Sequence, residues 1–192
     1  MYVLGLAGSP RRGGNTETLL DQALAGAASQ GAKTEKIVLS EVAMRPCQAC
    51  GGCAKTGICI IGDQAQEIQR KLREADRLIL ASPLFFLGVS AQAKTIIDRC
   101  QALWVTRYIL KQRHTLDSTG GRRRALFISV GGQRRPNTFE GALTTATAFF
   151  ATCDVAFEDA LLYSGIEEKS DIKKHPTALQ EAFEAGARLA QP

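Results

Sequence analysis

The sequence lacks a long uninterrupted hydrophobic run. Its longest apolar stretch, residues 78–91, has Pro83 at its centre and is shorter than the ~20 apolar residues that a membrane-spanning helix needs. The apolar stretch at residues 2–8 has no basic residue before it and is followed by Arg11 and Arg12, the reverse of a secretory signal. We therefore expect a protein without a membrane segment, located in the cytoplasm.

Aromatic residues are also scarce, at 6% of the chain. Lys and Arg exceed Asp and Glu by 24 to 19, and the basic residues cluster at 11–12, 122–124 and 134–135 rather than along one helix face. A nucleic-acid-binding surface would favour aromatic residues interleaved with such clusters, because bases stack on aromatic rings. The sequence therefore predicts anionic small-molecule ligands and no nucleic-acid partner.

Signs of disorder are absent as well. Hydrophobic residues make up 45% and charged residues 22% of the 192 residues, which are ordinary values for a soluble globular protein. This length suits one domain, and we expect residues 1–192 to form it. The six cysteines are not expected to form disulfides, because the cytosol keeps thiols reduced. Metal binding or redox chemistry is their expected role.

Short apolar runs alternate with segments of helical periodicity. The expected strands are 2–8, 33–39, 77–81, 125–130 and 155–162, and the expected helices are 16–31, 63–75, 90–108, 139–151 and 175–189. This alternation predicts a parallel sheet covered on both faces, because each right-handed crossover brings the chain back to the same edge. The expected fold is α/β, a flavodoxin-like three-layer sandwich with a five-stranded parallel sheet and a cysteine-rich loop, 45–62, inserted after the second strand.

The loop after the first strand reads GSPRRGGNT, residues 8–16. Hydroxyls, flexible backbone and positive charge here precede a predicted helix, whose unpaired N–H groups and dipole attract anions. The loop lacks the GxxxxGK[ST] and GxGxxG patterns, so a single phosphate is the expected anion. The alternative is an ordinary turn in which Asn15 caps the helix.

Two further loops follow predicted strands. The first, SPLFFLGV at residues 82–89, is apolar where chains usually become polar, which suits the faces of a flat heteroaromatic ring. The alternative is that Phe85 and Phe86 are core or interface residues. The second, SVGGQ at residues 129–133, contains glycines that let the backbone approach a ligand closely.

Together these three loops resemble the flavodoxin-like NADPH-dependent FMN reductase family over nearly the whole chain. The resemblance implies that the first loop holds the FMN phosphate and that the second and third frame the isoalloxazine ring. The implied FMN-binding residues are Ser9, Arg11, Asn15, Thr16, Pro83, Leu84, Phe85, Phe86, Gly131 and Gly132.

The most specific motif is a run of four thiols, Cys47, Cys50, Cys53 and Cys59, interspersed with glycines. A [4Fe-4S] centre takes four thiolates, and three cysteines at two-residue intervals can place their sulfurs around one compact core. The alternatives are zinc, whose structural sites usually pair two distant knuckles, and reactive thiols without metal. Cys100 and Cys153 are expected to be buried small hydrophobic residues.

The thiol motif on this fold resembles the iron-sulfur flavoprotein family of FMN- and [4Fe-4S]-containing electron carriers, which are oligomers. It implies an FMN-dependent oxidoreductase that accepts electrons from a ferredoxin-like donor or from NAD(P)H and forms a homo-oligomer, a dimer or tetramer. One alternative is an NAD(P)H-dependent FMN or quinone reductase without a cluster. The other is a metal-binding interaction module without flavin chemistry.

Overall fold

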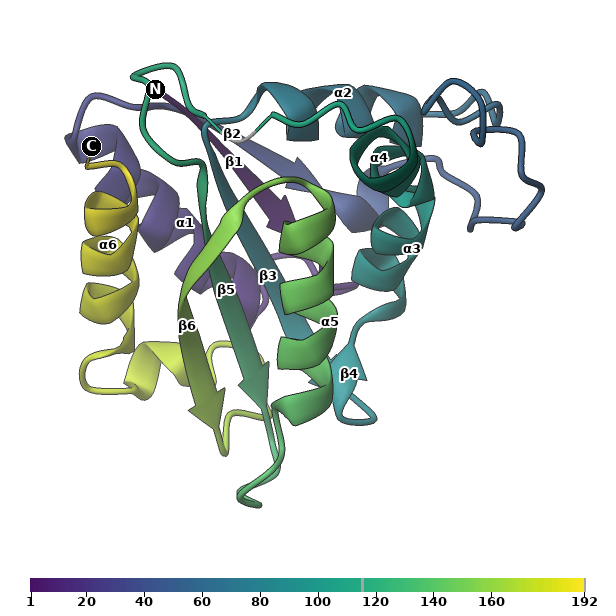
Figure 1. Cartoon of the computed structure of the whole chain (residues 1–192). Helices are drawn as coiled ribbons and strands as arrows, with labels where there is room; N and C mark the ends of the chain where they lie inside the picture. The colour runs from purple at the N-terminus through teal and green to yellow at the C-terminus, as the bar shows by residue number, and fades with distance from the viewer. Residues whose placement is uncertain (115, 192) are drawn as a thin grey trace.

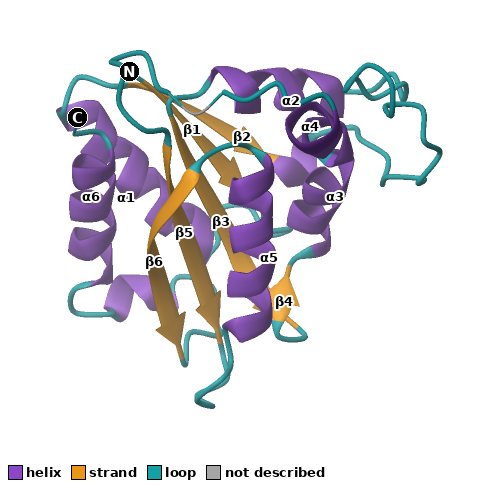
Figure 2. Cartoon of the chain, viewed as in Figure 1, coloured by secondary structure: helices purple, strands orange, loops and turns teal. Residues whose placement is uncertain are grey.

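The computed structural model describes residues 1–114 and 116–191 as alternating strands and helices (Figures 1 and 2). The strands are β1 (Tyr2–Ala7), β2 (Lys33–Val38), β3 (Arg77–Phe85), β4 (Gly88–Val89), β5 (Arg124–Gly131) and β6 (Ala156–Ser164). The helices are α1 (Asn15–Ser29), α2 (Ala65–Glu74), α3 (Ala91–Arg99), α4 (Gln101–Trp104), α5 (Glu140–Thr152) and α6 (Ala178–Leu189). Short helical turns occur at Leu39–Glu41, Val105–Ile109 and Asp171–Lys174.

The main sheet is parallel, with the order β2-β1-β3-β5-β6, and β4 pairs antiparallel with β3 outside it. Counting only the parallel strands along the chain, this is the 2-1-3-4-5 order of a flavodoxin-like sheet. The expected α/β flavodoxin-like sheet is therefore confirmed. Because all five strands run the same way, the loops that follow them meet at one edge (Figure 1).

Alternate residues of each central strand point to opposite faces of the sheet. On one face, Leu4 of β1 and Leu78 of β3 pack under α2, α3 and α5. On the other, Val3 and Ile79 pack under α1 and α6. The near-continuous apolar runs found in the sequence are therefore strands that are buried on both faces.

Helices α1 and α6 cross closely because two glycines lie where they meet. A Cβ atom built on Gly26 would come within 1.9 Å of the Phe183 carbonyl oxygen, and one built on Gly186 within 1.8 Å of the Ala23 carbonyl oxygen. Neither position has room for a side chain.

Two elements differ from the sequence expectation. Strand β3 continues to Phe85, beyond the expected end at residue 81, because it also pairs with β4. The expected helix 90–108 is divided at Cys100 into α3 and α4, and a π-helical turn follows. None of the helices in the described part of the chain is long and apolar enough to cross a membrane.

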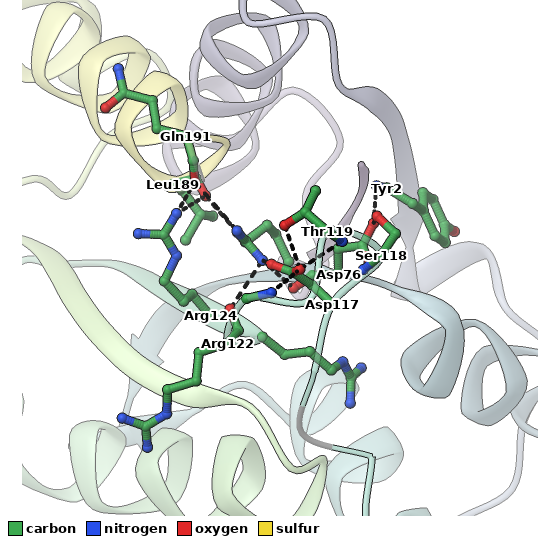
Figure 3. Close-up of polar contacts among 12 residues, drawn as sticks. Tyr2, Asp76, Asp117, Ser118, Thr119, Arg122, Arg124, Leu189 and Gln191 are labelled. Carbon is green, nitrogen blue, oxygen red and sulfur yellow. Dashed lines mark hydrogen bonds and ion pairs between the residues drawn. The ribbon is translucent and has the colours of Figure 1, made fainter.

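A buried polar cluster lies near the beginning of β3 (Figure 3). The Arg77 guanidinium donates to the Asp117 carboxylate over 2.5 Å, with both side chains almost fully buried. It also donates over 2.7 Å to the carbonyl oxygen of Leu189 at the end of α6. Arg77 thereby ties the last helix to the centre of the sheet.

Candidate functional site

The loop between β1 and α1 is folded by its own hydrogen bonds. The Ser9 hydroxyl accepts the Arg11 backbone N–H and donates to the Arg11 carbonyl, both over 3.1 Å. Gly14 precedes α1 as its N-cap residue and has extended backbone, and no side chain caps the N-terminus of this helix. The first N–H groups of α1 therefore lack an intrahelical partner and point toward this edge of the sheet.

The two arginines of this loop have different environments. Arg12 pairs with Glu41 over 3.2 Å and with Glu17 over 3.6 Å. Arg11 instead lines a cavity of about 430 Å³ at the end of the strands. Of the two guanidinium groups, Arg11 is the one available to an anion in that cavity.

Glu17 keeps its charge although it is almost buried. Its carboxylate accepts the Gly13 N–H over 2.7 Å and the Lys36 ammonium over 2.9 Å. Burial acts to raise the pKa of Glu17, but these hydrogen bonds outweigh it and hold the pKa below its ordinary value. The acid therefore stabilises the turn and pairs with Arg12 and Lys36.

The cavity combines all three loops that the sequence indicated. The expected residues that line it are Ser9, Arg11, Asn15, Thr16, Pro83, Leu84, Phe85, Gly131 and Gly132. A Cβ atom on Gly131 would lie 3.1 Å from the Leu84 side chain, so this glycine allows the two loops to come together. Phe86 is not among the lining residues. It borders a neighbouring hollow with Phe85 and Leu87.

Phe86 and Leu87 form the tip of a tight hairpin between β3 and β4. Phe85 pairs with Gly88 across it, and both tip residues have positive φ, 49° and 63°. That geometry is typical of a type I′ turn, which favours Asn-Gly, whereas bulky residues are strained in it. Phe86 is fully exposed.

We expect the double substitution Phe86→Asn, Leu87→Gly to raise the free energy of unfolding by about 1–3 kcal/mol, because it relieves that strain. Urea denaturation measures the change. The matched control, Phe86→Ala with Leu87→Ala, removes the same exposed side chains but keeps two non-glycine residues at positive φ. Equal stability of the two double variants would contradict the strain.

A fourth segment of the site, residues 165–172 after β6, was not expected from the sequence. Ile166, Glu167 and Lys169 line the cavity. Asn15 tethers this segment, because its side-chain amide donates to the Glu168 carbonyl over 2.8 Å and its oxygen accepts the Ile172 N–H over 3.3 Å. The side chain of Asn15 is thus engaged by the protein. The polar run directly after the last strand was the signal that would have indicated this segment.

The cysteine-rich segment 45–62, the thiol loop, lies between the helical turn at Leu39–Glu41 and α2 (Figure 2). All four predicted thiols line a second cavity of about 430 Å³, the thiol cavity. Cys47 and Cys50 are exposed, and Cys53 and Cys59 are half-buried. Burial raises the pKa of Cys53, and the charges of the other three thiols raise it further. The four side chains therefore act on one another.

The thiols do not form a closed metal site in this structure. Among residues 1–114 and 116–191, no three or more His, Cys, Asp or Glu side chains lie close enough together to hold a metal ion. The donor set still fits a four-thiolate group in kind and number, because all four sulfurs border one cavity. The metal site remains a prediction.

The other two cysteines lie apart from this loop. Cys100 and Cys153 are both buried in the core under α5. A hydrogen bond to Cys153, together with burial, raises the pKa of the Cys100 thiol well above its ordinary value. Both are the buried apolar residues that the sequence predicted.

The two charged residues at the end of α3 have separate structural roles. Asp98 is half exposed and pairs with Lys94 over 2.7 Å. The Arg99 side chain is buried and donates over 2.7 Å to Asp63, beside the thiol loop. A structural role is what the sequence led us to expect for both residues, and Arg99 also lines the thiol cavity.

Comparison with known proteins identifies relatives of this chain. The sequence model of the family described as NADPH-dependent FMN reductase matches residues 1–150. An iron-sulfur flavoprotein of Methanocaldococcus jannaschii is 46% identical over 103 residues, which cover 54% of this chain and 53% of that protein. A second one from the same organism is 32% identical over 151 residues, covering 78% and 71%. The chain thus spans about half the length of the first of these relatives.

The fold recurs in solved structures. The structure of NAD(P)H:quinone oxidoreductase from Methanothermobacter marburgensis is similar to that of this chain, with a TM-score of 0.73 and 16% sequence identity. The similarity covers 100% of this chain and 97% of that chain. At this identity, the likeness concerns the fold alone.

Proposed function

The chain belongs to the NADPH-dependent FMN reductase family, and from that premise we propose that it is an FMN-dependent oxidoreductase with a second redox group at its thiol loop. The observation that carries this proposal is the pair of cavities. One lies at the ends of the strands and combines Arg11 with the loops after β1, β3 and β5. The other is lined by Cys47, Cys50, Cys53 and Cys59.

The residues of the first cavity fit FMN. Arg11 and the first N–H groups of α1 would hold the phosphate, because both attract an anion at the same point. Pro83, Leu84 and Phe85 on one side and Gly131 and Gly132 on the other would flank the flat ring. When bound, FMN supplies the ability to exchange one or two electrons.

We expect Arg11→Ala to weaken FMN binding by about 10- to 150-fold, because a charge-assisted hydrogen bond contributes roughly 1.5–3 kcal/mol. Fluorescence titration of the apoprotein with FMN measures this. Arg12→Ala is the matched control and should leave the affinity nearly unchanged, since Arg12 pairs with Glu17 and Glu41. Equal losses in both variants would remove Arg11 from the phosphate site.

We further propose that the four thiols hold a [4Fe-4S] cluster. The donor set supports this, and so do the relatives, whose names describe iron-sulfur flavoproteins. A cluster supplies single-electron transfer. The chain's own contribution would be to place four sulfurs around one cavity and to shield them with the apolar side chains of Ile61 and Val105, which line the same cavity.

The alternative is an NAD(P)H-dependent FMN or quinone reductase whose thiols hold no cluster. The spacing of the thiols favours this alternative, because no three of them lie close enough together to hold a metal ion within the described residues. A visible spectrum of anaerobically purified protein, with iron and sulfide analysis, decides between the two. Flavin bands with a broad iron-sulfur shoulder support the cluster. Flavin bands alone support the alternative, and the absence of flavin bands would refute both.

We propose a ferredoxin-like one-electron donor as the partner, because the thiol loop is exposed, whereas hydride transfer needs a nicotinamide stacked on the flavin. We expect anaerobic stopped-flow reduction to bleach the flavin faster with reduced ferredoxin than with NADPH at equal concentration. A Cys50→Ala variant should lose the ferredoxin rate. If NADPH is the faster donor in both proteins, the alternative replaces this proposal.

We also propose a homo-oligomer. Phe86, Leu87 and Trp104 are exposed apolar side chains that association would cover.

A further inference from the structure

The buried guanidinium of Arg99, at the end of α3, links the thiol loop to the core. One terminal nitrogen donates to the Arg45 carbonyl over 2.8 Å and to the Asp63 carboxylate over 2.7 Å. The other donates to the Ile61 carbonyl over 3.1 Å. The side chain itself has no exposed surface.

These contacts close the loop at both ends. Arg45 precedes the first cysteine of the motif, whereas Ile61 and Asp63 follow the last. Asp63 reinforces the closure, because its carboxylate also accepts the Arg45 N–H over 2.9 Å. Arg99 and Asp63 thus hold together the two ends of the segment that carries all four thiols.

One donor of Arg99 has no acceptor. Its Nε is the only buried side-chain nitrogen or oxygen without a hydrogen-bond partner in residues 1–114 and 116–191. Leaving a buried donor unpaired is energetically unfavourable. A native structure tolerates such a cost where a ligand or a bound group supplies the acceptor.

The surroundings indicate which acceptor it is. Arg99 and Cys59 line the same cavity. The Arg99 guanidinium already holds the carbonyl oxygen of Ile61, two residues beyond Cys59. A thiolate sulfur is a charged acceptor, and a donor aimed at it forms a charge-assisted hydrogen bond.

We propose that Arg99 is a positioning residue of the thiol site, which closes the loop through Asp63 and two carbonyls and donates its free Nε–H to a thiolate sulfur, that of Cys59. The inference rests on the proposed function only in taking the four thiols as ligands of one metal group. A hydrogen bond to a ligating sulfur withdraws negative charge from it, so Arg99 stabilises the bound group and favours its reduced state.

Arg73 provides a matched control. Its guanidinium also contacts the loop, through the Gly57 carbonyl over 2.8 Å. It does not border the thiol cavity, and lines a different hollow with Cys153 and Asp154. Arg73→Gln therefore removes an arginine contact from the same loop without removing a donor to the sulfurs.

The test compares the full-length wild type with Arg99→Gln, Arg99→Lys and Arg73→Gln. Apoprotein with reduced thiols is titrated anaerobically with Co²⁺, and the sulfur-to-cobalt charge-transfer band reports thiolate binding. We expect Arg99→Gln to weaken Co²⁺ binding by about 10- to 100-fold, as losses of such supporting contacts do. Arg73→Gln should change it little. FMN content checks the fold of each variant, and Arg99→Lys decides if Arg99→Gln is insoluble.

A second readout separates tuning from mere support of the loop. After reconstitution with iron and sulfide, we compare the one-electron reduction of the bound group in Arg99→Lys and in the wild type. We expect its equilibrium constant to be at least about tenfold lower in Arg99→Lys, which corresponds to a reduction potential about 59 mV lower. Lysine keeps the charge but lacks the planar guanidinium, whose several N–H groups can donate to Asp63, the carbonyls and a sulfur at the same time. A purely structural Arg99 would change metal affinity and leave this potential unaltered, and that result overturns the sulfur hydrogen bond.

The remaining outcomes are equally decisive. If Co²⁺ binding weakens in Arg99→Gln as expected, but the wild type takes up no iron and sulfide, the cluster proposal fails. The role of Arg99 at a metal-thiolate site then stands. If the wild type takes up iron and sulfide, and Arg99→Gln matches Arg73→Gln in Co²⁺ affinity and in potential, the inference about Arg99 fails alone.

Discussion

Alanine at any one of Cys47, Cys50, Cys53 and Cys59 is expected to reduce bound iron and sulfide from about four of each per chain to nearly none, since a cubane centre needs four thiolates. FMN should remain bound, because the flavin cavity is formed by other loops. Iron, sulfide and flavin analyses of anaerobically purified variants measure both parts of this result. The four losses should be equal, because the thiols line one cavity and act as a set.

Cys153→Ala is the control for the loss of a thiol as such. Cys153 is buried beneath α5 and lies outside the thiol cavity, so its replacement should leave the iron content unchanged. Stoichiometric zinc in freshly isolated wild type would contradict the cluster. Iron retained in one of the four alanine variants would show that this cysteine is not a ligand.

Asp117→Asn is expected to lower the free energy of unfolding by about 3–5 kcal/mol, because it leaves the buried Arg77 charge without its partner. For a chain of this size, that is a fall in melting temperature of roughly 10 °C. Urea denaturation at a fixed FMN concentration measures it. Asp98→Asn breaks the exposed pair with Lys94 and should cost less than about 1 kcal/mol. Equal effects would contradict a structural role for the buried pair.

The effect of Asp117 should depend on pH in one direction. Burial acts to raise the pKa of its carboxyl group, but hydrogen bonds from Thr119 and Arg77 outweigh burial and hold the pKa below its ordinary value. The carboxylate therefore stabilises the folded state fully above its unfolded pKa of about 3.9, and this contribution is lost as the pH falls toward the lower folded value. The stability difference between wild type and Asp117→Asn should shrink below pH ~4 and stay constant above it.

The sequence alone determined the order of the elements and the class of fold. Buried parallel strands need continuous apolar runs such as those of β1 and β5, and amphipathic helices need a 3.6-residue period, so both patterns are written locally. The positions of the three loops that meet at the cavity beyond the strand ends followed from this order, since parallel strands end at one edge. The run of four cysteines was likewise visible in the sequence, because cysteine spacing is a local property.

Tertiary structure decided which side chains serve the site. Arg11 and Arg12 are adjacent and chemically identical, but Arg12 pairs with Glu17 and with Glu41, which is distant in sequence, whereas Arg11 lines the cavity. Asn15 looked like a phosphate ligand, yet its amide is engaged by the segment after β6. Arg99 was expected to have a structural role, but its partners in the thiol loop became clear only from the way α3 packs against that loop. Side-chain direction and burial depend on partners that sequence separation conceals, because a hydrogen bond or an ion pair is set by distance in space and not by distance along the chain.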